Sequence, residues 1–392
     1  MHDELEIVEY NFESSSHKIL PGVNKYHCTL HNLDIECNYT YSTEVGNPNS
    51  NVDTKDICIE ENRFYKYQII KPKGEATTQR VVFLFHGFNE KDWGKYVPWA
   101  KAISESTGFS VILFPIAFHM QRAPKGWSNK REMFKLSEMR KRSYPNVVHS
   151  TLSNVAISIR LHSMPQRFIW SGLQTYYDVI QLIEECKEGK HPYISKNFEF
   201  DFFAYSIGGF LAQILKLSNY NNYFANSKVC LFCSGATFNR LSPVSKFILD
   251  SEANIALYSF LIEHFDSVLQ KDNLLHHYIT EHLEGQVFRS MLNYQRMRDL
   301  REGLLKKYED QIYAITLKKD LVIPSFEVIN TLKGAYRTIN IKVEELDFNR
   351  EYIHENPFNA DSGTSQLVDE DFKLVFSKVS DFFKKDNFKN LA

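Results

Sequence analysis

The sequence predicts an α/β protein with a mostly parallel central sheet that helices cover on both faces. From residue 80 onward, short and almost wholly apolar runs alternate with longer amphipathic segments. Such runs are typical of strands buried on both faces, and the segments between them are typical of crossover helices. Of the 392 residues, 43% are hydrophobic and 14% aromatic, so the chain can bury the large core that this architecture needs.

The expected strands share short length and apolar composition, and they cover residues 80–85, 110–114, 198–205, 228–233, 312–317 and 339–343. The expected helices have apolar residues at three- and four-residue spacing, and they cover residues 93–105, 168–186, 208–217, 322–332 and 370–383. These elements place the core of the fold in residues 80–238 and 309–392.

The polar N-terminal segment, residues 1–79, contains loop signals and two strand-like runs, 33–41 and 57–70. We expect it to supply antiparallel strands and loops that lead into the core rather than a separate domain.

Two further segments depart from the alternation of strands and helices. Residues 117–167 are long and basic, and we expect an irregular insertion there. Residues 239–308 are mostly helical by pattern, and we expect a helical cap. Both insertions should lie over the carboxyl edge of the sheet, where α/β folds bind their ligands.

Charge and hydropathy exclude several classes of partner. The chain has 46 basic and 48 acidic residues, so no overall field favours nucleic acid or an anionic membrane. No apolar run approaches the roughly 20 residues that a membrane span needs, and Met1–Glu6 lacks the apolar core of a signal peptide. We expect a cytoplasmic protein with a small-molecule partner and no membrane span; its oligomeric state is open.

Neither a metal nor a cofactor is predicted. Cys230 and Cys233 form a C-x-x-C pair inside an apolar, strand-like run, which favours core packing over a redox or zinc role. Four histidines lie at helical positions without an H-E-x-x-H pattern, namely His264, His276, His277 and His282. The phosphate-binding patterns of P-loop and dinucleotide-binding proteins are absent as well.

The most informative run is Phe200–Phe210. An apolar stretch rich in phenylalanine ends at Ser206, and Gly208 and Gly209 precede a helical pattern. This order predicts a strand, a sharp turn and a helix, with the hydroxyl of Ser206 projecting from the end of the sheet. A serine at this turn could also act only as a helix N-cap.

Over about residues 80–385 the chain resembles the α/β-hydrolase superfamily, and the resemblance is specific at four places. These are the loop Phe85–Asn89 after a buried strand, the turn Ala204–Gly209, the segment Thr316–Pro324 and the loop Tyr352–Phe358. Ala204 stands where the usual G-x-S-x-G pattern has its first glycine. The whole chain also resembles an uncharacterised family within this superfamily, which adds no function.

The resemblance implies a catalytic triad in the order Ser206, Asp320, His354. In such a triad His354 takes the proton of Ser206 and later returns it, and Asp320 orients the imidazole. Each residue has a structural alternative: Asp320 could cap the next helix, with Glu327 as the second candidate acid, and a loop histidine is often structural.

The same resemblance implies an oxyanion hole. Its donors would be the backbone N–H of Ile207 and that of Phe88 or Asn89. His86 and Gly87 would support this loop structurally.

Candidate substrate-binding residues follow the strand expected at 110–114. His119, Arg122 and Trp127 could line a pocket together with Tyr205, and Arg122 could bind a carboxylate or phosphate. The alternative is a solvated basic loop.

The predicted function is a serine hydrolase that cleaves a carboxylic ester or thioester through an acyl-enzyme, with the helical insertion covering an apolar acyl pocket. An acyltransferase needs only a different acceptor. A non-catalytic binding protein that retains the triad-like residues is the second class of function. In a third, the basic stretch Lys130–Arg142 contacts a protein partner.

Overall fold

The computed structural model describes residues 4–20, 25–28, 33–36, 52, 54–359 and 363–385. The strands are β1 (Leu5–Glu13), β2 (Lys25–Cys28), β3 (Leu33–Glu36), β4 (Phe64–Pro72), β5 (Thr78–Phe85), β6 (Ser110–Phe114), β7 (Ile194–Tyr205), β8 (Val229–Phe232), β9 (Ile312–Leu317) and β10 (Lys342–Leu346). In these residues one sheet contains eight strands in the order β1-β4-β6-β5-β7-β8-β9-β10, and β2 pairs with β3 separately.

Most of the large sheet is parallel. Only β4 runs against its neighbours within it: it pairs antiparallel with β1 and with β6, whereas the pairs from β6 to β10 are parallel. The carboxyl ends of β5, β7 and β9 therefore meet at one edge. The residues that follow these strands are His86, Ser206 and Lys318, so the sheet itself brings the expected oxyanion loop, the serine and the acid segment together.

The helices are α1 (Glu60–Arg63), α2 (Tyr96–Thr107), α3 (Lys130–Ser143), α4 (Val155–Ser163), α5 (Arg167–Lys187), α6 (Ile207–Ser218), α7 (Ser251–Tyr258), α8 (Phe265–Leu269), α9 (Asn273–His276), α10 (Leu283–Leu292), α11 (Arg298–Lys307), α12 (Ser325–Leu332) and α13 (Ser365–Lys384). None of these helices combines the length and the apolar composition that a membrane crossing requires.

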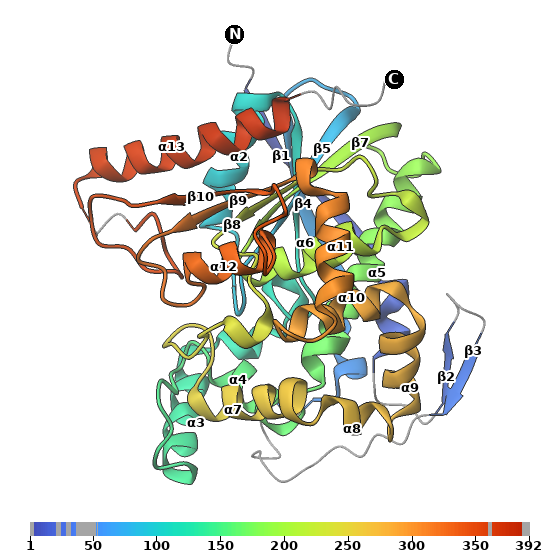
Figure 1. The fold of residues 1–392 in the computed structure, drawn as a ribbon, viewed down its shortest axis with the longest axis vertical. Helices are drawn as coiled ribbons and strands as arrows, with labels where there is room; N and C mark the ends of the chain where they lie inside the picture. Colours follow the sequence, from blue (N-terminus) through green and yellow to red (C-terminus); the bar gives the residue numbers. More distant parts are fainter. Residues whose placement is uncertain are drawn as a thin grey trace.

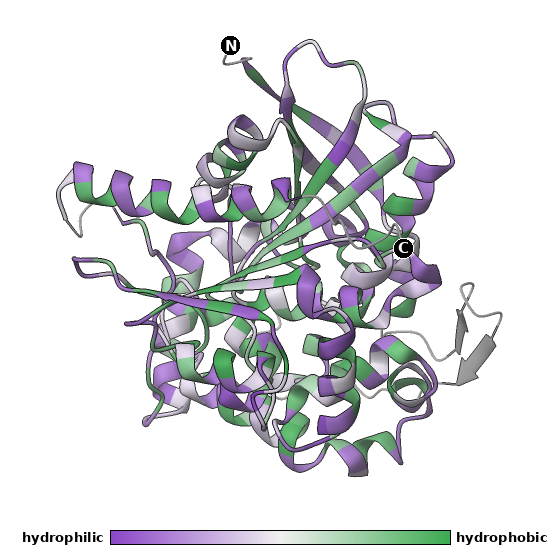
Figure 2. Cartoon of the chain, turned by 45° about the horizontal axis from the view of Figure 1, so that its top comes forward, coloured by the Kyte–Doolittle hydropathy of each residue, from purple (hydrophilic) through white to green (hydrophobic). Residues whose placement is uncertain are grey.

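Helices cover both faces of the sheet (Figure 1). α2 and α13 pack on one face, where Trp99 meets the rings of Phe203 and Phe232 and Phe376 meets that of Phe203. α5 and α6 pack on the other. The central strands are hydrophobic over most of their length, and the helices are amphipathic, as the colours of Figure 2 show. The doubly covered sheet explains why its central strands have continuous rather than alternating apolar sequences.

The prediction of a strand over residues 57–70 is wrong for the first half of that range. A 3-10 turn, Asp56–Cys58, and α1 occupy that half, and β4 begins only at Phe64. The buried carboxylate of Asp56 accepts hydrogen bonds from the guanidinium groups of Arg160 and Arg167. These distant contacts override the local pattern. Of the run 33–41, residues 37–41 lie outside the described part of the chain.

The segment 117–167 is not irregular, because it contains α3 and α4. Asn129 caps α3 by accepting the backbone N–H groups of Arg131 and Glu132 at 3.1 and 3.2 Å. The basic residues of α3 lie mostly on its exposed face, but Arg140 is buried and forms a bidentate pair with Asp250. The high charge hid a helix that its N-cap could have revealed.

Residues 239–308 contain α7 to α11 and two π-helical turns, Ser259–Glu263 and His277–Glu281. α10 packs against α6 near the carboxyl edge of the sheet (Figure 1). This segment thus covers the region beside Ser206.

Asp201 on β7 makes stability depend on pH. It is buried, its Oδ1 accepts the backbone N–H of Lys228 at 2.7 Å, and Arg80 lies 3.7 Å from Oδ2. Burial raises the pKa of Asp201 from its ordinary value of 3.8 to about 6. Between about pH 4 and pH 6 the unfolded chain loses this proton and the folded chain keeps it, so Asp201 lowers stability as the pH rises.

We expect Asp201→Asn to remove that loss, because asparagine keeps the acceptor for Lys228. The stability difference between variant and wild type should grow by about 3 kcal/mol from about pH 4 to about pH 7. Urea unfolding at both pH values measures it. A constant difference would show that Asp201 is ionised throughout.

Candidate active site

Ser206 lies at a sharp turn between β7 and α6. The φ and ψ angles of Ser206 are 54° and −125°, in a backbone region that residues other than glycine rarely adopt. Its backbone N–H donates to the carbonyl of Phe232 at 3.2 Å, and its carbonyl accepts the hydroxyl of Ser234 at 2.6 Å. Such strain, which costs about 1–3 kcal/mol, persists only where the surroundings fix it.

His354 and Asp320 meet Ser206 in a hydrogen-bonded chain. The Oγ of Ser206 lies 2.7 Å from Nε2 of His354, and Nδ1 of His354 lies 2.7 Å from Oδ2 of Asp320. All three side chains are buried. Ser206 follows β7, Asp320 follows β9, and His354 lies in the loop between β10 and α13.

The surroundings of Asp320 assign the tautomer of His354. The Oδ1 atom accepts the backbone N–H groups of Val322 and Ile323, both at 2.9 Å. The carboxylate has only acceptors, so Nδ1 of His354 carries a proton and Nε2 is left to accept the hydroxyl of Ser206. This is the protonation state that a general base needs.

Tyr205 holds the loop that carries His354. Its hydroxyl donates to the backbone carbonyl of His354, and the two rings stack with centroids 5.4 Å apart. Lys95 lies over the Tyr205 ring at 4.8 Å and donates to the carbonyl of Glu355 at 3.0 Å. Tyr205, expected to bind substrate, also lines the cleft in front of Ser206, yet its hydroxyl is committed to the histidine loop.

The loop after β5 has a neutral histidine at its base. Nδ1 of His86 donates to the carbonyl of Gly87 at 2.7 Å, and Nε2 accepts the backbone N–H of Ile116 at 2.9 Å. Burial holds the pKa of His86 well below its usual value. Both nitrogens are thus used to fix the loop.

The expected oxyanion donors are backbone N–H groups beside Ser206 and in the loop after β5. In the described part of the chain, no hydrogen bond uses the backbone N–H of Phe88, of Asn89 or of Ile207, so all three are available to a ligand. Gly87 is different, because its N–H donates to the hydroxyl of Tyr96 at 2.9 Å.

Asn89 joins this loop to both insertions. Its backbone has a φ of 59°, and its side-chain NH₂ donates to the carbonyls of Ser153 at 2.9 Å and Phe247 at 2.6 Å. Phe247 belongs to residues 239–308 and Ser153 to residues 117–167. The side chain of Asn89 thus has a bracing role that the sequence did not indicate.

A cleft of about 550 Å³ opens in front of Ser206 and His354, and both charged and apolar side chains line it. Trp127, one of the candidate substrate-binding residues, lines it together with Lys91 and Asn356. The half-buried ammonium of Lys91 has its pKa lowered to about 8 by burial.

Arg122 is not a ligand-binding residue. It is fully buried, and its Nη2 atom pairs with Asp178 at 2.7 Å. Its Nε and Nη1 atoms donate to the side chain of Asn62 and to the carbonyl of Pro115. The guanidinium group of Arg122 thus makes its hydrogen bonds inside the protein. The predicted anion-binding role and the alternative prediction of a solvated basic loop are both wrong for this residue.

His119 lies beside the loop after β5 rather than in the cleft. Its Nδ1 donates to the carbonyl of Ala117 at 2.9 Å, and its ring meets that of Phe88 with centroids 5.3 Å apart. Burial lowers its pKa to about 4, so it is neutral. Its Nε2 atom has no hydrogen-bond partner among the described residues.

Residues that sequence reasoning missed mostly support the backbone. Ser234 holds the carbonyl of Ser206, and Tyr96 holds the N–H of Gly87. The one signal for the role of Ser234 was its position just after β8, the strand beside the serine turn.

Cys233, expected in the core, is fully buried with a φ of 48°. Burial and the adjacent carboxylate of Asp320 raise the pKa of its thiol.

The histidines of the third segment lie apart from this site. His277 and His282 approach each other at 3.0 Å, and Nδ1 of His277 contacts Glu281 at 2.7 Å. Within the described ranges, no group of three or more potential ligand side chains is arranged to hold a metal ion.

The strand order, the antiparallel β4 and the serine turn after β7 define an α/β-hydrolase fold. The chain belongs to a family of unknown function, DUF6051, whose model matches residues 1–384. A search of curated proteins finds no match.

Among solved structures, the chain is similar to several esterases. With carboxyl esterase 2 of the mycorrhizal fungus Tuber melanosporum it shares 12% identity at a TM-score of 0.44, covering 81% of both chains. With a thermostable esterase from Pseudomonas putida it shares 11% at 0.42, covering 83% of this chain and 81% of that one. With esterase Est22 bound to p-nitrophenol it shares 12% at 0.46, covering 97% and 81%. Because a fold does not determine an activity, function must be inferred from the site.

Proposed function

We propose that this protein is a serine hydrolase that cleaves carboxylic esters or thioesters through an acyl-enzyme. The observation that carries the proposal is the buried chain of two 2.7 Å hydrogen bonds from Ser206 through His354 to Asp320. The strained backbone of Ser206 and the unused N–H groups of Ile207 and of the loop after β5 support the same conclusion. A serine that only capped α6 would need neither.

The reaction follows from this geometry. Oγ of Ser206 attacks the acyl carbonyl while Nε2 of His354 takes its proton, and Asp320 stabilises the resulting imidazolium. The N–H groups of Phe88 and Ile207 bind the oxyanion. When the bond to the leaving alcohol or thiol breaks, His354 gives it the proton. Water then attacks the acyl-serine by the same steps, releasing the acid and restoring Ser206.

The test is covalent labelling with a small fluorophosphonate, read by intact mass and peptide mapping. We expect one adduct, on Ser206, and none in Ser206→Ala. Ser110→Ala is the matched control, because it removes another buried serine hydroxyl that has no imidazole beside it. An unlabelled but folded wild-type protein, or an adduct on another residue, would contradict the proposal and favour a binding protein.

A further inference from the structure

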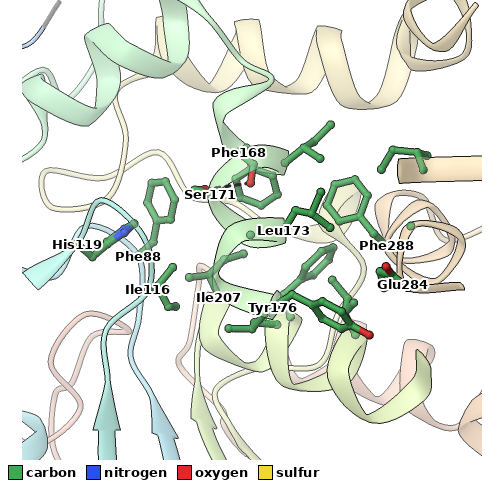
Figure 3. A pocket seen from close by; sticks show the side chains of 17 residues that line it. Phe88, Ile116, His119, Phe168, Ser171, Leu173, Tyr176, Ile207, Glu284 and Phe288 are labelled. Atoms are coloured by element: carbon green, nitrogen blue, oxygen red, sulfur yellow. Dashed lines mark hydrogen bonds between the residues drawn. The ribbon is translucent and has the colours of Figure 1, made fainter. Parts of the chain in front are cut away.

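A narrow slot lies between α5 and α6, beneath α10, and no step of the mechanism above uses it (Figure 3). Its volume is about 70 Å³. Aromatic and aliphatic side chains form most of its wall, among them Phe88, Phe168, Ile207, Phe210, Ile214 and Phe288. A slot of this width and composition suits an unbranched apolar chain better than a ring or a polar group.

The slot runs away from the serine. α5 and α6 point in the same direction, because Phe168 lies beside Phe210 with ring centroids 6.3 Å apart, and eight residues later in each helix the hydroxyl of Tyr176 lies 2.8 Å from that of Ser218. α6 begins directly after Ser206. The slot therefore starts at the oxyanion end of the site and follows the two helices inward.

The length of the slot can be taken from α6, which lines it from Ile207 to Ile214. Seven residues of helix at 1.5 Å each span about 10 Å. With carbon–carbon bonds of about 1.5 Å in a zigzag, an extended chain of about eight carbon atoms has this length. Such a chain is bulkier than the 70 Å³ open in the slot, so the side chains that line the slot have to move apart to admit it.

Each end of the slot has one polar side chain, the neutral imidazole of His119 at the end near Phe88 and the carboxyl group of Glu284 at the far end. Figure 3 shows Phe88 and His119 at one end and Glu284 and Phe288 at the other. Glu284 is buried and accepts the hydroxyl of Tyr177 at 2.5 Å. Because the ester carbonyl has to lie at Ser206 to be attacked, the tail of the acyl chain would extend toward Glu284, and a longer chain would press its methylenes against this polar group.

The ring of Phe88 separates the slot from the serine. It borders the slot, the cleft in front of Ser206, and a small apolar cavity of about 40 Å³ that Ser206 and Ile207 also line. Phe168 borders the slot and the small cavity, with its ring centroid 6.4 Å from that of Phe88. Rotation of the Phe88 side chain would join these spaces.

We propose that this slot binds the acyl chain of the substrate, an unbranched aliphatic chain of about eight carbon atoms, with the alcohol or thiol part in the cleft in front of Ser206. The proposal rests on the proposed function and names its substrate class. Each buried methylene should raise kcat/KM about fourfold up to this length, and longer chains should lose the gain at Glu284.

Gly172 on α5 offers a direct test. It lines the slot, and a side chain added there meets no heavy atom within 4 Å at its Cβ, so leucine can project into the slot. Leucine also favours a helix over glycine, so Gly172→Leu should fold. Gly303→Leu is the matched control, since Gly303 is helical and exposed with equally open space, far from the slot lining.

The measurement is kcat/KM for p-nitrophenyl esters from acetate to dodecanoate. In wild type we expect a maximum near octanoate. In Gly172→Leu the ratio of octanoate to acetate should fall about 60-fold, the loss of about three buried methylenes, whereas Gly303→Leu should keep the wild-type ratio. A ratio unchanged in Gly172→Leu, or lowered equally in Gly303→Leu, would overturn the proposal.

A second measurement separates the slot from the catalytic function. Binding of octanoate to Ser206→Ala, followed by calorimetry, requires the slot but no nucleophile, and Gly172→Leu should weaken it in that background. Octanoate binding without fluorophosphonate labelling of wild type would retain the slot and reject the hydrolase. Labelling without octanoate binding would do the reverse.

Discussion

Replacing Asp320 with asparagine is expected to lower kcat for ester hydrolysis by about four orders of magnitude in a protein that stays folded. Oδ1 of Asp320 accepts two backbone N–H groups, from Val322 and Ile323, and Oδ2 accepts His354. The single amide oxygen of asparagine will remain on the two backbone donors, so its NH₂ group will face Nδ1. An NH₂ group only donates, which moves the imidazole proton to Nε2, and Nε2 can then no longer accept from Ser206.

Glu327→Gln is the control for Asp320→Asn. Glu327 follows the same strand, lies in the first turn of α12 and contacts Arg240 at 3.6 Å, but it makes no hydrogen bond to His354 among the described contacts. Its kcat should stay close to that of wild type. Steady-state kinetics on a short-chain ester measures both variants, with circular dichroism to establish folding. If Glu327→Gln lost activity and Asp320→Asn kept it, the acid would be Glu327.

How much of the fold the sequence predicts depends on burial. The strand at 312–317 is buried throughout and that at 80–85 is buried from Val81 onward, so their apolar runs marked them closely. The last strand was expected at 339–343 but is β10, Lys342–Leu346. It is an edge strand with exposed charged side chains such as Glu345, and a strand that faces solvent has no continuous apolar run to detect.

In the candidate site, too, the positions set by the strand order were predictable, whereas those set by contacts between distant residues were not. Ser206, Asp320 and His354 were identifiable because each follows its strand in an order that the fold fixes. The role of Arg122 was not, because its partner Asp178 lies 56 residues away on α5 and no sequence pattern relates the two. A basic residue in a polar stretch looks the same whether it binds a ligand or a buried carboxylate.

Gly208→Ala is expected to lower kcat at least about a hundredfold and the free energy of unfolding by about 1–3 kcal/mol. An added Cβ would lie 2.6 Å from the carbonyl oxygen of Phe85 and 2.7 Å from that of His86. Both are backbone atoms where β5 enters the oxyanion loop, so no rotamer change can relieve the clash. The methyl group must push the N-terminus of α6 away from this loop, and that separates the N–H of Ile207 from the N–H of Phe88.

Gly209→Ala provides the contrast, because its added Cβ meets the side chain of Ser234 instead of backbone. Removing that side chain in the double variant Gly209→Ala/Ser234→Gly should recover much of the stability that Gly209→Ala loses, whereas no side-chain deletion can relieve Gly208→Ala. Gly303→Ala, in open space on α11, should be neutral or slightly stabilising. Thermal unfolding and kcat are measured on all four proteins. Wild-type kcat in Gly208→Ala would mean that the contact between α6 and β5 does not set the spacing of the two oxyanion donors.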